Sequence, residues 1–238
     1  MRLTVIAPTS DPAILDLVRD EAAGWASPGT AIDVAGLPST AAIASRHDTA
    51  LAVPDLLAAI GKAERSGSEG VLVSCAGDPA VHEARETAAI PVVGGFQPAA
   101  LTALSLGERL GFITVLPSVV PMLRALIRSE GLTGRVGTIR ALGADTLDVH
   151  DTGALTGLIR EQAADILLRD EADVIVLGCT GFVGAAARVQ QDLADTGFDV
   201  PVVDPTGAAV LWLESLVRLG VRSSRTTYHP PPTMTWLA

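Results

Sequence analysis

Hydrophobic and polar positions alternate between two patterns along the chain. Short runs rich in Val, Ile and Leu, bounded by Gly or Pro, predict β-strands over residues 3–7, 31–36, 70–75, 91–94, 111–116, 135–142, 173–179 and 201–204. The longer segments between these runs carry apolar residues at helical spacing. Such faces are Ile14, Val18, Ala22 and Trp25 in the first segment, Val120, Leu123 and Ile127 in a later one, and Val210, Leu213 and Val217 in the last. Strands that alternate with amphipathic helices predict an α/β protein built on parallel sheets.

An internal repeat narrows the architecture. Eight strands and eight helices could also close into one (β/α)₈ barrel. However, VLVSCAGDPAVHEARETAAIPVVGGFQPAAL, from residue 71, and VIVLGCTGFVGAAARVQQDLADTGFDVPVVDPTGAAVL, from residue 174, share one order: apolar strand, Cys, Gly, Ala-rich helix, Pro-Val-Val and another helix. The repeat therefore predicts two pseudo-symmetric doubly wound parallel-sheet domains with the active site in the cleft between them. We expect residues 1–96 plus 206–238 to form the first domain and residues 97–205 the second.

Composition and charge restrict the kinds of partner. The chain has 238 residues, of which 48% are hydrophobic and 18% charged, and this composition is typical of a packed globular protein. Its net charge of −10, without a cluster of Lys or Arg, argues against nucleic acid as a partner. The N-terminal MRLTVIAPTS lacks the pattern of a signal peptide, and no apolar run approaches the ~20 residues that cross a bilayer. We expect a cytoplasmic protein that acts on a small molecule without a membrane partner.

The two cysteines of the chain occupy matching places in the repeat. Cys75 and Cys179 each follow an apolar strand run, and ligands of open parallel sheets bind beyond the carboxyl ends of the strands. Asp78 followed by Pro79 predicts an N-cap and the first residue of a helix, which places Cys75 just before a helix N-terminus. The partial positive charge of that terminus is expected to lower the pKa of the thiol below about 8.5.

Other readings of the same features remain possible. A single cysteine after an apolar strand is commonly a packing residue, but two at equivalent places favour a function. The residues after each thiol are small, and Gly77 and Gly181 leave space for a ligand beside the backbone. Two distant thiols fall short of the four ligands of a zinc site, and His150, between two aspartates, is expected in a solvated loop, so no metal is predicted. His82, early in a helix, is expected on a solvated face.

Several segments together resemble one family. The two strand-Cys loops, HDTALAVPDLL, GFITVLP and the ending RLGVRSSRTTYHPPP are similar to the aspartate/glutamate/hydantoin racemase superfamily, and most similar to its hydantoin and allantoin racemase branch. The resemblance covers nearly the whole chain. It implies a homo-oligomeric isomerase that needs no cofactor, in which one cysteine removes a proton next to a carbonyl and the other returns one to the opposite face. These catalytic residues would be Cys75 and Cys179.

The resemblance also implies where the substrate binds. The residues that match the family's substrate-binding positions are Pro8, Ser10, Ala76, Gly77, Asp78, Thr114, Val115, Thr180 and Gly181. Members that act on free amino acids typically have Asn-Thr after the first cysteine, whereas Ala-Gly-Asp-Pro follows it here. This difference favours a 5-substituted hydantoin or a related cyclic ureide over an amino acid.

Two alternatives remain open at this stage. One is a racemase of aspartate or glutamate, or a maleate-isomerase-like enzyme of the same superfamily. The other is a two-lobed protein that binds a small molecule without chemistry and only buries its thiols.

Overall fold

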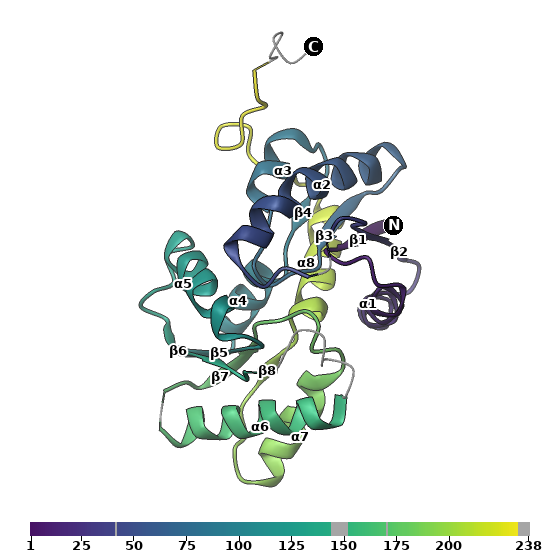
Figure 1. Ribbon diagram of the computed structural model, residues 1–238. Helices are drawn as coiled ribbons and strands as arrows, with labels where there is room; N and C mark the ends of the chain where they lie inside the picture. The colour runs from purple at the N-terminus through teal and green to yellow at the C-terminus, as the bar shows by residue number, and fades with distance from the viewer. Residues whose placement is uncertain (41, 144–151, 170, 233–238) are drawn as a thin grey trace.

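The chain folds into two lobes, each built on a four-stranded parallel sheet (Figure 1). The computed structural model describes residues 1–40, 42–143, 152–169 and 171–232. The first sheet contains β1 (Arg2–Ala7), β2 (Ala31–Gly36), β3 (Gly70–Val73) and β4 (Val92–Val93), and the second contains β5 (Leu110–Thr114), β6 (Val136–Ala141), β7 (Val174–Leu177) and β8 (Val202–Val203). Two separate sheets exclude the closed barrel and confirm the predicted fold class.

The two sheets have the same topology. Their strand orders are β2-β1-β3-β4 and β6-β5-β7-β8, and every pairing is parallel. The inner strands β3 and β7 are buried at every residue, which explains their unbroken apolar sequences. The outer strands β4 and β8 have only two residues each, so they present little unpaired edge. The repeat in the sequence is therefore a repeat in space.

Helices cover both faces of each sheet. They are α1 (Pro12–Trp25), α2 (Arg46–Arg65), α3 (Val81–Thr87), α4 (Phe96–Leu104), α5 (Val120–Ser129), α6 (Thr152–Leu168), α7 (Ala185–Asp195) and α8 (Pro205–Leu219). In the first lobe, α2 and α3 pack on one face and α1 and α8 on the other. In the second lobe, α4 and α5 pack on one face and α6 and α7 on the other. Each lobe therefore has its own hydrophobic core on either side of its sheet.

Two helices exchange lobes. Helix α4 follows the last strand of the first sheet but packs on β5, β7 and β8, whereas α8 follows the last strand of the second sheet but packs on β3, β4 and α1. The two exchanged helices also contact each other, so they form the centre of the interface between the lobes (Figure 1). This arrangement agrees with the predicted return of the last helix to the first half, although the exact domain limits stay a prediction.

Some local predictions were wrong. The strand runs predicted to reach Cys75 and Cys179 end two residues earlier, at Val73 and Leu177. Trp25, predicted on the buried face of α1, is 40% exposed, because it lies at the last turn, where only one side of its ring packs against the chain at Gly207. His150 lies outside the described residues.

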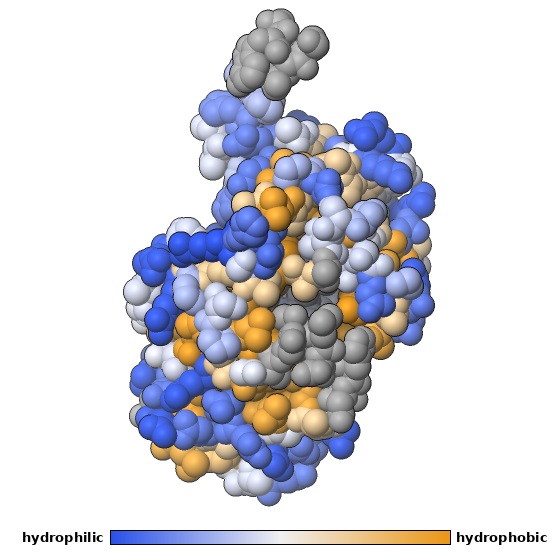
Figure 2. Space-filling view, viewed as in Figure 1, coloured by the Kyte–Doolittle hydropathy of each residue, from blue (hydrophilic) through white to orange (hydrophobic). Residues whose placement is uncertain are grey.

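The surface separates polar from apolar residues by position. Figure 2 shows hydrophilic residues along the outer margins of the visible face, while apolar residues collect toward its middle. Over the part of the chain that the structure describes, no helix is both long enough and apolar enough to cross a membrane.

Candidate active site

The two cysteines lie in turns of the same geometry. Each thiol stands two residues beyond its strand, and the backbone N–H two residues further on donates to it: from Gly77 to Sγ of Cys75 at 3.5 Å, and from Gly181 to Sγ of Cys179 at 3.3 Å. Both cysteines are unpaired and partly exposed. The structural repeat therefore extends to the sulfur atoms.

The helices after the two turns also begin alike. Helix α3 starts after Ala80 and α7 after Gly184, and both residues have the left-handed conformation, with φ of 61° and 66°. Each helix thus begins six residues after its cysteine, at Val81 and Ala185. The N-cap predicted at Asp78 is wrong, because Asp78 itself lies in a left-handed turn, with φ of 47°, before the helix.

The two turns meet at the interface between the lobes. A methyl group built on Gly95 would lie 3.2 Å from the carbonyl oxygen of Cys75 and 2.8 Å from Cγ2 of Thr180. Gly95 N–H donates to the same carbonyl of Cys75, at 3.2 Å. Only a glycine leaves enough space for the Cys75 turn, the start of α4 and the Cys179 turn to approach so closely. In the sequence, nothing but the pair Gly94-Gly95 points to this position.

Burial is the main cause of the pKa shift of each thiol. It raises the pKa of Cys75 to about 12, against the opposing hydrogen bond from Gly77, and the charges of Cys179 and Asp78 add to the rise. Burial also raises the pKa of Cys179, opposed by the N–H of Gly181. The predicted lowering of the thiol pKa was wrong, because loss of hydration outweighs helix termini that begin several residues away. Both rises favour the thiol over the thiolate at neutral pH.

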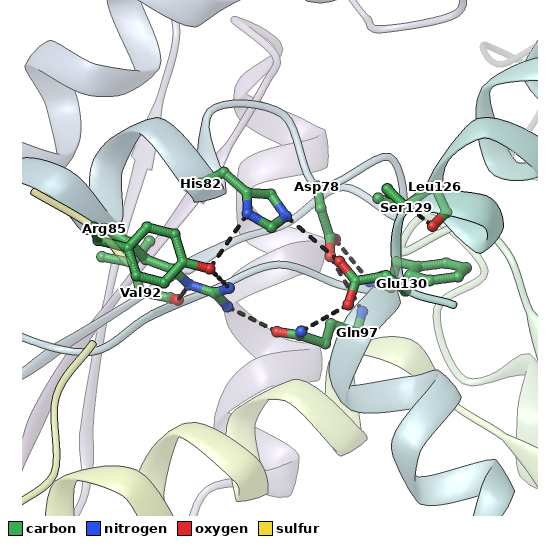
Figure 3. A network of polar contacts seen from close by, with 10 residues as sticks. Asp78, His82, Arg85, Val92, Gln97, Leu126, Ser129 and Glu130 are labelled. Atoms are coloured by element: carbon green, nitrogen blue, oxygen red, sulfur yellow. Dashed lines mark hydrogen bonds and ion pairs between the residues drawn. The ribbon is translucent and has the colours of Figure 1, made fainter. Parts of the chain in front are cut away.

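The side chain of Asp78 binds the start of α4 and not the start of α3, the helix that follows it in the sequence. The residue is only 8% exposed, and its carboxylate accepts hydrogen bonds from the backbone N–H groups of Phe96 at 2.7 Å and Gln97 at 3.1 Å (Figure 3). Burial raises the pKa of Asp78 to about 6, although these two hydrogen bonds and the charge of Arg85 oppose the rise. Asp78 therefore caps α4, and its contact with a substrate stays a prediction.

The other predicted binding residues lie near the ends of the inner strands. Thr114 ends β5, and its buried hydroxyl donates to the carbonyl of Gly178, directly before Cys179, at 3.2 Å. Val115 belongs to the hydrophobic core of the second lobe, and Ala76 is buried beside Cys75. Pro8 is half-buried and Ser10 exposed after β1. Their contact with a substrate stays a prediction.

Met122 is a further neighbour of the first thiol turn. Its Cε lies 3.8 Å from a methyl group built on Gly77, so this α5 side chain reaches from the second lobe to the Cys75 turn. No feature of the sequence distinguished this methionine from the other apolar residues of α5.

Polar contacts hold the lobes together on one side of the thiols. Glu130, at the end of α5, accepts a hydrogen bond from Gln97 Nε2 at 3.0 Å and lies 3.4 Å from His82 Nε2 (Figure 3). Arg85 donates to Oε1 of Gln97 at 2.8 Å. His82 thus contributes to the interface between the lobes rather than only to a solvated face.

A second set of contacts joins the chain before α2 to the start of α5. Ser118 Oγ donates to the carbonyl of Ala44 at 2.8 Å, and Arg46 Nη2 donates to the carbonyl of Pro121 at 3.5 Å. The lobes are therefore tied together at two separate places.

Two surface cavities lie away from the cysteines. One of about 240 Å³ is beside β4 and α8, where Arg85, Trp212 and Tyr228 line it, and one of about 300 Å³ lies between α5 and β6. Neither is lined by a thiol. The polar side chains Arg85, Gln97 and Tyr228 of the first cavity already bond to one another, which marks them as part of the packing between the lobes.

Comparison with known proteins identifies the family. Residues 3–212 match the model of the Asp/Glu/Hydantoin racemase family. The chain is 32% identical to the hydantoin racemase of Paenarthrobacter aurescens over 237 residues, which cover 98% of both chains. It superposes on allantoin racemase from Klebsiella pneumoniae with a TM-score of 0.88 at 31% identity, covering 98% of this chain and 95% of the other. For allantoin racemase from Pseudomonas fluorescens the TM-score is 0.90 at 30% identity, with 99% of both chains covered. The matched fold, the repeat and these similarities show that the chain belongs to the Asp/Glu/hydantoin racemase family.

Proposed function

We propose that the protein racemises a 5-substituted hydantoin or a related cyclic ureide, such as allantoin, with Cys75 and Cys179 as the two proton-transfer groups. The observation that carries this proposal is the pair of matching thiol turns at the interface between the lobes. Inversion at carbon needs a base on one face and an acid on the other, and a pseudo-two-fold repeat supplies both in the required mirror relation.

The reaction follows from the acidity of the ring carbon. A thiolate takes the proton of C5, so the C5–H bond breaks and an S–H bond forms, while the electron pair moves onto the neighbouring carbonyl oxygen as an enolate. The opposite thiol then gives its proton to the other face of C5 and becomes the thiolate. Exchange of protons with water restores the starting state of the enzyme, and the reaction as proposed uses no cofactor.

The substrate class follows from the charges near the thiols. The buried carboxylate of Asp78 adds negative charge beside Cys75, and the whole chain carries a net charge of −10. An aspartate or glutamate substrate would bring two more carboxylates to this point, whereas hydantoins and allantoin are uncharged near neutral pH. The site therefore favours a neutral ring over a free amino acid. The hydantoin and allantoin racemases to which this chain is similar agree with that choice.

Racemisation in D₂O tests the proposal. Single enantiomers of 5-benzylhydantoin, 5-isopropylhydantoin and allantoin are incubated with the enzyme, and optical rotation and deuterium at the stereocentre are measured after subtraction of the spontaneous rate. We expect loss of rotation with incorporation of one deuterium, and no inversion by Cys75→Ala or Cys179→Ala. Full activity of either variant would exclude the two-thiol reaction.

Parallel assays separate the alternatives. Racemisation of aspartate or glutamate, or isomerisation of maleate, without activity on any cyclic ureide would replace the proposed substrate. A protein that binds a hydantoin but neither inverts it nor exchanges its hydrogen would be a binding protein. We also propose that the enzyme is cytoplasmic and homo-oligomeric. Light scattering of the purified protein measures the oligomeric state.

A further inference from the structure

The two halves of the protein differ in the position of one acidic residue. At the position where the first thiol turn has Asp78, three residues after its cysteine, the second has Phe182, which is 1% exposed in the core of its lobe. Otherwise the turns correspond closely, since Gly77 matches Gly181 and Ala80 matches Gly184 in position and conformation. The acid therefore breaks an otherwise good symmetry beside one of the two thiols.

In the second half, the capping acidic residue lies after the last strand and not in the thiol turn. Asp204 directly follows β8 and caps its own helix, α8, by accepting the N–H of Gly207 at 2.7 Å. The matching residue of the first half is Gly94, and a methyl group built there would overlap the carboxylate of Asp78. The capping carboxylate of α4 thus comes from the Cys75 turn, and Gly94 leaves it the space that a local side chain would fill.

Holding Asp78 in place constrains the Cys75 turn. The residue adopts a left-handed backbone, which is unfavourable for a side chain other than glycine. Its two hydrogen bonds to Phe96 and Gln97, and the N–H of Asp78 that donates to the carbonyl of Cys75 at 3.2 Å, compensate for this conformation. The turn that carries the first thiol is therefore fixed against a helix that belongs to the second lobe.

The charges around the two thiols also differ. Cys75 lies near Cys179 and Asp78, and both raise its pKa further after burial has done so. Asp78 itself lies near Arg85, which favours its ionised form, and near Glu130, which opposes it. Phe182 supplies no charge to the turn of Cys179, where burial raises the pKa of the thiol and the N–H of Gly181 lowers it.

We propose that Asp78 is a positioning residue that makes the two thiols unequal: it fixes the Cys75 turn on α4, and its charge adds to the burial that keeps Cys75 protonated, so that Cys179 is the thiol that ionises more readily and supplies the thiolate for the reaction. The catalytic part of this inference rests on the proposed racemase function. In that reaction Cys179 first removes the proton from the enantiomer whose hydrogen faces it, and Cys75 gives its own proton to the opposite face. The other enantiomer reacts only with the less populated form of the enzyme, in which Cys75 is the thiolate and Cys179 carries the proton.

The inequality is measured on the thiols themselves, so the test does not depend on racemase activity. Wild-type protein and Asp78→Asn are alkylated from pH 6 to 10 with neutral iodoacetamide and with anionic iodoacetate, and mass spectrometry gives the rate at each cysteine. In the wild type we expect the ratio of iodoacetate rate to iodoacetamide rate to be lower at Cys75 than at Cys179. In Asp78→Asn we expect Cys75 to react faster at every pH of the range and its ratio of iodoacetate rate to iodoacetamide rate to rise severalfold, while Cys179 changes little.

Asp204→Asn is the matched control. Asp204 is also a buried cap of an interface helix with a pKa raised, by burial first, to about 6, but it does not act on either thiol. We expect this variant to leave both alkylation profiles unchanged. If Asp78→Asn only loosened the turn, both reagents would react faster by the same factor at Cys75, and the electrostatic role would be refuted.

The wild-type measurement keeps the inference open to refutation even if Asp78→Asn does not fold. Equal reagent ratios at the two cysteines of the wild type would overturn it. Unequal thiols in a protein that racemises nothing would leave this inference standing and refute the proposed function alone.

Discussion

Gly95→Ala tests whether catalysis requires both thiol turns to approach Gly95 closely. The backbone of Gly95, with φ of −83° and ψ of −24°, suits any residue, so the effect of the substitution is steric. The new methyl group would lie 2.8 Å from Thr180 Cγ2 and 3.2 Å from the carbonyl oxygen of Cys75, both closer than ordinary van der Waals contact. Relief of this crowding requires the two turns to move apart by a few tenths of an ångström or more.

The expected sizes of the two effects differ. Overpacking of this kind costs about 1–3 kcal/mol of stability. Misplacement of reacting groups by about 1 Å costs a rate factor of about 100. A shift of a few tenths of an ångström should therefore lower racemase activity severalfold, which is more than the loss of folded protein explains. Urea unfolding measures the first effect, and kcat/KM for the preferred ureide, followed by polarimetry, measures the second.

Two further variants act as controls. Thr180→Ser removes the crowded Cγ2 and keeps the hydroxyl, so we expect it to restore part of the activity and stability of Gly95→Ala in the double variant. Gly24→Ala, in α1, meets no atom within 4 Å, and should raise stability by about 0.4–1 kcal/mol with normal activity. Normal activity of Gly95→Ala would refute the close approach of both turns to Gly95 as a requirement for catalysis.

Two other predictions concern pH. Burial alone would raise the pKa of Glu214, but hydrogen bonds from Ser27 and Thr30 outweigh burial and lower this pKa. The hydrogen bonds therefore stabilise the folded protein above the unfolded pKa of about 4.3, and their contribution is lost as the pH falls through the folded pKa. Glu214→Gln should therefore lose about 2 kcal/mol in urea unfolding at pH 7 and much less at pH 3.5, and an equal loss at both would contradict the assignment. Because burial raises the pKa of both thiols, kcat/KM should increase from pH 7 to pH 9, after correction for spontaneous racemisation, and a plateau already reached at pH 7 would argue against a thiol as the base.

The sequence was most informative where structure depends on the apolar pattern. The inner strands β3, after its first residue, and β7 are unbroken runs of Val, Ile and Leu. The same order of Cys, Gly and Ala-rich helix after each of them is enough to predict two related lobes. The positions of Cys75 and Cys179 beyond strand ends follow from the same pattern, because parallel strands carry their functional loops at the carboxyl edge.

What the sequence could not predict depends on partners that are distant along the chain. Asp-Pro at residues 78–79 follows the local rule for an N-cap, but the carboxylate of Asp78 finds better donors at the start of α4. The contact of His82 with Glu130 joins α3 to the end of α5 and has no local signal. The predicted lowering of the thiol pKa was wrong for the same reason, since burial is a property of the folded interface and not of the Cys75 segment.

The exchange of α4 and α8 between the lobes has a consequence for dissecting the protein. A fragment that stops at residue 95 would lack α8, and the apolar side chains of Leu3, Val5, Leu72 and Val93 would face water where α8 had covered them. A fragment that begins at residue 97 would contain α8, which packs on β3, β4 and α1 of the first lobe. We therefore expect that no single cut yields a half that folds alone and that both lobes melt in one cooperative transition. Chimaeras with relatives should take both exchanged helices from the same parent.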